Sequence, residues 1–167
     1  MLAVPYELEA EICIGPGIYR EKLVCEKRAL TLRGAGADAT TLIFGDGGKL
    51  PHPDGRPTHT FRSYTAFFSG GSVTVEDLTI ANDAGPGSAV GQAIAAYVDA
   101  EKAVFRRVRL LGNQDTLFCA PCPRLNGRRT AFLAPASLRP AALRRSITRA
   151  VRSRGTSTSS LAGRCPV

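Results

Sequence analysis

The two stretches that decide the fold are SVTVEDLTIAN at residues 72–82 and KAVFRRVRLLG at residues 102–112. They align position for position, with apolar residues at 73, 75, 78 and 80 in the first and at 103, 105, 108 and 110 in the second. Alternating apolar residues indicate a half-buried strand, and the two polar residues in the middle break the alternation as a corner does. Each stretch therefore reads as strand, corner, strand. Two copies predict a solenoid whose coils stack short parallel strands.

The rest of the chain up to about residue 118 has the same character. Short runs rich in β-branched and aromatic residues alternate with Gly, Asn and Asp, and no helical periodicity is found before about residue 138. Further runs of this kind are Ile12–Ile14, Leu30–Leu32, Thr41–Phe44, Ala66–Phe68, Ala93–Tyr97 and Thr116–Phe118. Two-residue hairpin turns of the Asn-Gly type are missing, which disfavours a β-sandwich. We therefore expect an all-β fold, a right-handed parallel β-helix of four or five coils with a period of roughly 20–25 residues.

Charge divides the chain into two parts. Residues 1–115 hold all 14 acidic residues against 12 basic ones, whereas residues 116–167 hold ten arginines and no acid. The composition changes within the basic part, where Arg, Ala, Pro and Ser dominate and little can be buried. We expect residues 1–123 to form the β-helix and residues 124–167 to be an irregular or disordered basic tail.

Several classes of function are disfavoured by composition. No run approaches the ~20 apolar residues of a transmembrane helix, and the N-terminus lacks the basic and apolar regions of a secretory signal. Cys119 and Cys122 form a lone C-x-x-C, without the second pair or the histidines that a zinc site needs. We expect no metal and no membrane association. The sequence pI near 9.7 comes from the tail alone, so we expect no specific nucleic acid as partner, although charge-driven binding through residues 124–164 stays an alternative.

Three polar residues have a spacing that predicts a catalytic site: Gln92, Gln114 and Asp115. The two glutamines are separated by one coil of such a solenoid, so they should stack about 4.8 Å apart on neighbouring strands. Amide N–H groups are suited to an oxyanion hole, and an adjacent aspartate is suited to proton transfer or nucleophilic attack. The alternative from spacing alone is an amide ladder or a turn cap without function.

Five ordered motifs carry a resemblance to a known family. They are GPGIYREK (15–22), LTLRG (30–34), DLTIAN (77–82), GQA (91–93) and GNQDTL (112–117). In order and approximate spacing they resemble the pectinesterases, also called pectin methylesterases, over residues 12–118. That family folds as a right-handed parallel β-helix, in agreement with the repeat.

The resemblance implies hydrolysis of galacturonate methyl esters in pectin, with release of methanol and without a cofactor. In the family an aspartate attacks the ester, a second aspartate protonates the leaving methoxide and later activates water, and glutamines stabilise the oxyanion. Carried over by motif, Asp115 is the acid/base residue, Gln92 and Gln114 are the oxyanion glutamines, and Thr58 to Thr65 lie on the substrate-facing loop. The implied partner is pectin or homogalacturonan, and the implied location is extracellular.

The family's nucleophile has no counterpart in this chain. It belongs to an Asp-Phe-Ile-Phe-Gly motif one coil further on, near residue 137, where this chain reads APASLR (134–139) without a carboxylate. The Leu-Gly-Arg-Pro-Trp motif, whose arginine orients nucleophile and substrate, is absent as well. Since Asp115 cannot be nucleophile and proton donor in one step, we expect little or no esterase activity.

The loss of the motifs is abrupt, and it leaves two further expectations. RLNGR (124–128) still resembles the family, whereas the composition changes from Arg129 onward. We hypothesise that a frameshift or gene-model error replaced the remainder, in which case another reading frame encodes the missing Asp-Phe-Ile-Phe-Gly. The solenoid would then be truncated, with its oligomeric state open. The alternative to an enzyme is a non-catalytic carbohydrate-binding solenoid that keeps the substrate groove.

Overall fold

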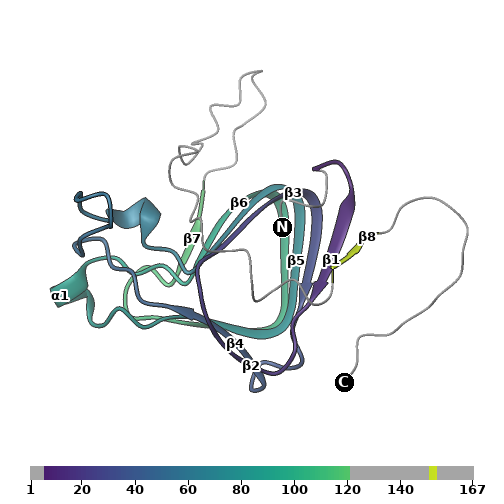
Figure 1. Cartoon of the computed structure of the whole chain (residues 1–167), viewed down its shortest axis with the longest axis horizontal. Helices are drawn as coiled ribbons and strands as arrows, with labels where there is room; N and C mark the ends of the chain where they lie inside the picture. The colour runs from purple at the N-terminus through teal and green to yellow at the C-terminus, as the bar shows by residue number, and fades with distance from the viewer. Residues whose placement is uncertain (1–5, 121–150, 154–167) are drawn as a thin grey trace, which may run out of the picture.

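The chain forms a solenoid of β-strands in a computed structural model that describes residues 6–120 and 151–153 (Figure 1). Its elements are β1 (Glu9–Cys13), β2 (Gly17–Arg20), β3 (Leu23–Arg33), β4 (Thr40–Phe44), the 3-10 helix η1 (Thr60–Arg62), β5 (Ala66–Asn82), α1 (Gly87–Val90), β6 (Ala96–Leu111), β7 (Leu117–Cys119) and β8 (Val151–Ser153). In the part of the chain that the structure describes, α1 is the sole α-helix, so the all-β prediction is confirmed. No helix of this part has the length and apolar character that crossing a membrane requires.

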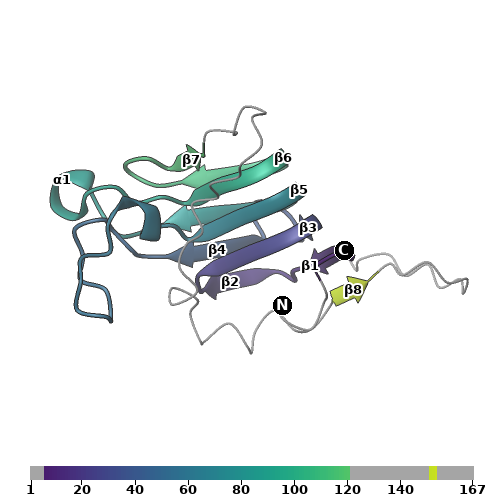
Figure 2. The ribbon, with the colours of Figure 1, turned by 90° about the horizontal axis from the view of Figure 1, so that it is seen from above.

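Successive coils stack in parallel (Figure 2). Their registers divide the strands into three faces. The first face holds β1 and residues 29–33, 72–76 and 102–106 of β3, β5 and β6. The second face holds β2, β4 and residues 78–82 and 108–111 of β5 and β6. The third face holds residues 23–27, 66–70 and 96–100 of β3, β5 and β6, followed by β7. This arrangement is a parallel β-helix.

The repeat predicted from the sequence is confirmed by the register of β5 and β6. Position 73 pairs with 103, 75 with 105, 78 with 108 and 80 with 110. The expected period is not uniform along the chain, because Glu9 pairs with Ala29 whereas Leu23 pairs with Ala66, a far longer step in sequence. Loops of unequal length between the coils account for the difference, since the strands themselves keep a constant register.

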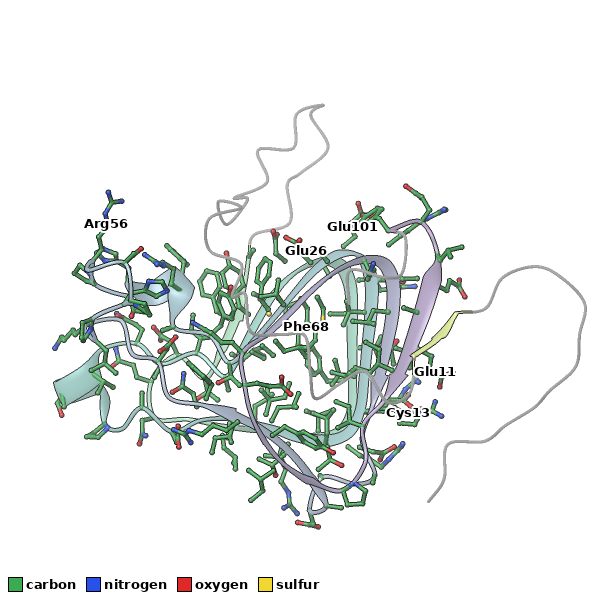
Figure 3. The ribbon with its side chains drawn as sticks, in the orientation of Figure 1. Glu11, Cys13, Glu26, Arg56, Phe68 and Glu101 are labelled. Atoms are coloured by element: carbon green, nitrogen blue, oxygen red, sulfur yellow. The ribbon has the colours of Figure 1, made fainter. Side chains whose placement is uncertain are left out.

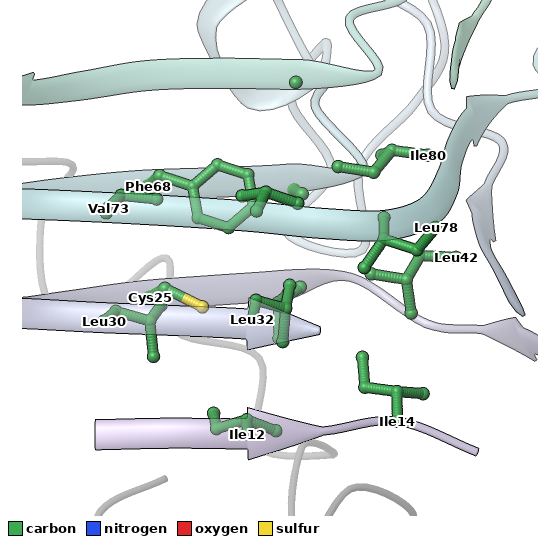
Figure 4. Packing of buried hydrophobic residues seen from close by; sticks show 14 of the residues in the cluster. Ile12, Ile14, Cys25, Leu30, Leu32, Leu42, Phe68, Val73, Leu78 and Ile80 are labelled. Carbon is green, nitrogen blue, oxygen red and sulfur yellow. The ribbon is translucent and has the colours of Figure 1, made fainter. Parts of the chain in front are cut away.

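Rows of apolar side chains hold the coils together. Ile12 pairs with Leu32, which pairs with Val75, and these three side chains are at most 1% exposed. Figure 4 shows such side chains stacked from strand to strand inside the solenoid. Burying one side chain of this size contributes about 1.5–3 kcal/mol, so each coil is stabilised chiefly by its neighbours.

Two kinds of corner turn the chain between faces. Between the third and first faces, Gly70 has a φ of +118°, and a Cβ there would overlap the backbone carbonyl oxygen of Lys27. Only glycine fits such a position without strain. Between the first and second faces, Asp77 and Arg107 adopt left-handed φ values of 56° and 52°, at the corner predicted by the two polar residues of the repeat. Their side chains form an ion pair with a 2.5 Å contact, which links two coils.

A ladder of alternating charges crosses the first face. Glu76, whose side chain is 8% exposed, accepts hydrogen bonds from Arg106 at 2.8 Å and from Arg33 at 3.2 Å. Arg33 also lies 3.5 Å from Glu11, so the ladder spans four coils. The hydrogen bond from Arg106, opposed by burial and reinforced by Arg33, holds the pKa of Glu76 below its ordinary value.

Some elements were not predicted. No strand was expected at β2, whose side chains are not buried, or in the first half of β3, although the latter begins with the apolar run Leu23–Cys25. In the predicted tail, the structure describes residues 151–153, which form β8 antiparallel to β1. The other residues of 124–167, including those near residue 137, lie outside the described residues, and the division at residue 123 stays a prediction.

We expect Gly70→Ala to lower the free energy of unfolding by at least about 3 kcal/mol, because it combines a forbidden φ with a clash against rigid backbone. The matched control is Gly55→Ala. Gly55 also has a positive φ, of +78°, but a Cβ added there would meet no atom within 4 Å. Its expected cost is about 1–2 kcal/mol. Urea denaturation of both variants measures the difference; equal losses would contradict the close approach of the coils at Gly70.

We expect Glu76→Gln to cost about 1 kcal/mol at pH 7, because it removes charge-assisted hydrogen bonds from a buried group. The folded-state pKa of Glu76 is lowered, so the carboxylate stabilises the fold above its unfolded pKa and loses this effect as pH falls through the folded value. The difference between wild type and variant should therefore shrink below about pH 4.5. Denaturation at pH 7 and pH 3.5 measures it. Asp38→Asn, which removes a carboxylate with an 83% exposed side chain from an ion pair, is the control that should change little.

Candidate functional site

Long loops leave the solenoid at the corner between the second and third faces. Residues 45–65, 83–95 and 112–116 connect the strands there, and the first two carry η1 and α1. In Figures 1 and 3 they extend to the left of the coils, with Arg56 at their outer end and Phe68 inside the solenoid. All three residues of the predicted site belong to these loops.

The structure brings the segments of Gln92 and Gln114 side by side. The N–H of Ala93 donates to the carbonyl oxygen of Gln114 at 3.0 Å, and the N–H of Ala95 donates to that of Thr116 at 2.9 Å. These are the contacts of one coil on the next, so the spacing of the two glutamines in the sequence does correspond to adjacent coils, although both lie in loops and not on strands as expected.

Gln92 is held at both its backbone and its side chain. Its carbonyl oxygen accepts from the N–H of Gly48 at 2.8 Å, and its side-chain Oε1 accepts from the hydroxyl of Thr60 at 3.1 Å. Both partners lie on the 45–65 loop. That loop therefore covers and orients the glutamine, a contact that the sequence motifs did not reveal.

Gln114 and Asp115 are exposed. The Gln114 amide lies against Gly87 of α1, where a Cβ would overlap its Oε1. Asp115 has a left-handed φ of 57°, a strained conformation for a residue other than glycine. Within residues 6–120 its carboxylate takes part in none of the ion pairs. It is thus open to solvent beside Gln114.

Lys22 anchors the ends of the 45–65 loop. Its Nζ donates to the carboxylate of Asp46 and, at 2.5 Å, to the carbonyl oxygen of Arg62. The same ammonium lies 4.9 Å from the ring centroid of Tyr64 and 5.7 Å from that of Phe44, at cation–π distance. Burial lowers the pKa of Lys22, although the hydrogen bond to Asp46 opposes the shift. Burial likewise raises the pKa of Tyr64 to about 12.

A second ionic contact orders the outer part of the loop. Arg62 Nη2 donates to Asp54 at 2.7 Å and lies 2.6 Å from Nδ1 of His52. The hydrogen bond from Arg62 holds the pKa of Asp54 at about 2, helped by the backbone N–H of Arg56. This carboxylate is therefore ionised near neutral pH, a structural group and not a proton donor.

Aromatic rings line the corner beside the glutamines. Tyr97 and Phe118, neighbours on β6 and β7, have centroids 4.9 Å apart, and Phe67 packs 4.9 Å from Tyr97. Phe61 on η1 lies 5.4 Å from Phe118 and is 47% exposed. The cluster thus presents an aromatic surface to solvent next to polar groups, which is the composition of a binding groove for an amphipathic ligand such as a sugar.

The segment from Thr58 to Thr65, expected on a substrate-facing loop, does lie on the 45–65 loop, but its two ends are buried. Thr58 and Thr65 are at most 1% exposed, and the Thr65 hydroxyl donates to the carbonyl oxygen of Ala81 at 2.8 Å. Only the middle of the segment, where Phe61 lies, reaches the surface. Thr65 fastens the loop to the second face, whereas Thr58 bonds within the loop through its N–H to the carbonyl oxygen of Leu50.

The cysteine pair offers no metal site within the described residues. Cys119 is a free, exposed thiol, and Cys122 lies outside those residues. In residues 6–120 and 151–153, no group of three or more His, Cys, Asp or Glu side chains is arranged to hold a metal ion.

Comparisons with known proteins agree with this geometry. Residues 3–123 match the sequence profile of the pectinesterase family. Pectinesterase QRT1 of Arabidopsis thaliana is 34% identical over 117 residues, a match that covers 65% of this chain and 30% of that protein. This chain spans about a third, or less, of the length of the curated relatives that it matches.

Solved structures show the same relation. A pectin methylesterase from Yersinia enterocolitica superposes with a TM-score of 0.67 at 28% identity, over 71% of this chain and 42% of that one. A pectin methylesterase solved in complex with a hexasaccharide gives a TM-score of 0.65 at 28% identity, over 71% of this chain and 39% of that one. These enzymes are right-handed parallel β-helices, which confirms the predicted fold class and its handedness. In fold and in sequence over residues 3–123, the chain belongs to the pectinesterase family.

Proposed function

We propose that this chain binds methyl-esterified homogalacturonan and carries the acid/base and oxyanion half of a pectinesterase active site. Asp115 is the acid/base residue, and Gln92 and Gln114 are the oxyanion donors. The observation that supports this most directly is the hydrogen bond from Ala93 to Gln114, which joins the two glutamine segments and leaves Asp115 beside them. The structural relative solved with a bound hexasaccharide supports a pectin oligosaccharide as the ligand.

The proposed chemistry follows from these groups. Attack on a methyl ester turns the carbonyl oxygen into an oxyanion, which amide N–H donors stabilise more than they stabilise the neutral ester. Asp115 in its acid form gives a proton to the leaving methoxide, and its carboxylate then takes a proton from the water that releases the product. No metal or cofactor is needed for these steps.

The nucleophile is the missing part. The chain has no acidic residue after Asp115. The other carboxylates on the loops around the site are in ion pairs, Asp46 with Lys22, Asp54 with Arg62 and Asp83 with Arg20. With one unpaired carboxylate where the reaction uses two, hydrolysis by this chain should be negligible.

A non-catalytic role in carbohydrate binding is the second candidate. The exposed ring of Phe61, supported by Phe118 and Tyr97, favours it, because this surface needs no nucleophile in order to bind a sugar. Charge-driven binding of nucleic acid through residues 124–164 concerns residues outside the described ones and stays a prediction. Pectin as ligand implies that the protein acts outside the cell.

Two assays test the proposal on the purified full chain. Methanol release from methyl-esterified pectin should not exceed that of Asp115→Asn, whereas a methyl-esterified oligogalacturonate should bind in isothermal titration calorimetry. Phe61→Ala should weaken that binding about threefold to tenfold, because it removes an exposed aromatic contact worth about 0.5–1.5 kcal/mol. Ile18→Ala, at a 78% exposed residue of β2 on the second face, is the matched control and should bind as wild type does.

Each result has a contrary outcome. Methanol release that Asp115→Asn abolishes would contradict the predicted inactivity and would require a nucleophile elsewhere in the chain. Absence of binding to the oligosaccharide would remove both the catalytic and the carbohydrate-binding proposals.

A further inference from the structure

The Gln92 amide has one end that is already occupied. A glutamine side chain ends in an oxygen that accepts and an NH2 group that donates, and the two ends have nearly the same shape. An oxyanion donor must present the NH2 group, so the amide has to be held against a flip that exchanges its two ends. We propose that Thr60 is a positioning residue, whose hydroxyl binds Oε1 of Gln92 and so turns the NH2 group toward the ester.

The contact itself is direct. Thr60 Oγ1 donates to Gln92 Oε1 at 3.1 Å, from a partly buried position. Because the hydroxyl occupies the oxygen, the two N–H donors of Gln92 are left for a ligand. The effect of this contact on ligand binding rests on the proposed function, but the orientation of the amide can be measured without any ligand.

Gly48 forms the wall behind the amide. Its N–H donates to the carbonyl oxygen of Gln92 at 2.8 Å, and its own carbonyl oxygen accepts from the N–H of His59 at 2.8 Å. A Cβ on Gly48 would lie 3.2 Å from Gln92 Oε1 and 3.4 Å from the backbone nitrogen of Thr60. The two loops are thus joined through one residue without a side chain, and the amide oxygen fits between Gly48 and Thr60.

Thr60 is in turn held firmly at the start of η1. Its carbonyl oxygen accepts from the N–H of Ser63 at 3.1 Å and from the Ser63 hydroxyl at 2.7 Å. Lys22 fixes the other end of η1 through the carbonyl oxygen of Arg62. His59, just before Thr60, has a φ of 59°, a strained conformation that persists where its surroundings enforce it. A hydroxyl on such a rigid support can orient the Gln92 amide, because the hydroxyl stays in place when the amide moves.

Gln114 provides an internal comparison. Within the described residues its amide makes no hydrogen bond, and its side chain is exposed. Gln92 and Gln114 are the only glutamines in the sequence, so labelling glutamine with 15N at the side-chain amide gives two NH2 groups to compare. Substituting Gln114 by Met assigns the two signals.

The experiment measures the heteronuclear NOE of both NH2 groups in the full chain and in two variants. Thr60→Val keeps the shape of the side chain and removes the hydroxyl, so the Gln92 NH2 should become about as mobile as that of Gln114. Thr60→Ser keeps the hydroxyl and should restore the wild-type order. The Gln114 signal should be the same in all three proteins.

Two results would overturn the proposal: an unchanged Gln92 NH2 in Thr60→Val, or a Thr60→Ser variant that behaves like Thr60→Val. If Thr60→Val does not fold, the exchange of the Gln92 amide protons with solvent in the wild type tests the proposal instead. With Oε1 bound to Thr60, both Gln92 amide protons should exchange at similar rates. Protection of one proton by about tenfold would mean that the hydroxyl accepts from the NH2 group, and it would overturn the proposal as well.

Titration with a methyl-esterified oligogalacturonate separates this inference from the proposed function. Ligand should shift the Gln92 NH2 signal in wild type and in Thr60→Ser, with affinity about threefold to tenfold lower in Thr60→Val, as expected for one hydrogen bond. If no ligand binds while the Gln92 NH2 is ordered by Thr60, the proposed function fails and the orienting contact stands. If ligand binds equally well to all three proteins, the contact between Thr60 and Gln92 does not contribute to ligand binding, and its proposed role in the site is wrong.

Discussion

The parallel register of one coil on the next is the constraint on which the rest of the structure depends. Main-chain hydrogen bonds fix the spacing between adjacent coils. The rows of inward side chains that include Ile12, Leu32 and Val75 fix which residues of each coil point into the core. A shift by one residue would turn every inward side chain outward, so the register is strongly specified. The hydrogen bond from Ala93 to Gln114 continues this register into the loops. Proximity of the two glutamines is therefore a consequence of the core.

The three corners of the solenoid divide rigidity and variability between them. At Gly70 and at Asp77 the chain turns within one or two residues. Gly70 turns against the backbone of the adjacent coil, and Asp77 is in an ion pair with that coil, so neither corner has room for inserted residues. The third corner carries every long loop, and it also carries Gln92, Thr60 and the exposed ring of Phe61. Loops can vary in length there without disturbing the ladders on either side. A rigid scaffold with variable loops at one edge is a common way to hold a binding site.

Sequence reasoning was sufficient for features that depend on periodicity within a coil. The repeat of residues 72–82 in 102–112 predicted both strands and the corner at Asp77, and the spacing of Gln92 and Gln114 predicted the pairing of their segments. It was insufficient for contacts between loops of different coils. Lys22 meets Arg62 and Thr60 meets Gln92 across long separations in the sequence, along a loop path that no local pattern encodes. β2 was missed because its side chains are not buried, so they carry no apolar alternation.

The surroundings of the carboxylates separate structural acids from the candidate catalytic one. Glu76 and Asp54 have lowered pKa values because arginines donate hydrogen bonds to them, so near neutral pH they stay ionised and cannot supply a proton. Asp46 is bound by the partly buried Lys22, where neutralising either partner would leave the other charge uncompensated. Asp115 has no cation partner among the described residues, so its carboxylate is not part of an ion pair of the fold. A neighbouring cation favours the ionised form that a carboxylate nucleophile needs. The surroundings of Asp115 therefore fit the acid/base role that we propose for it better than the role of a nucleophile.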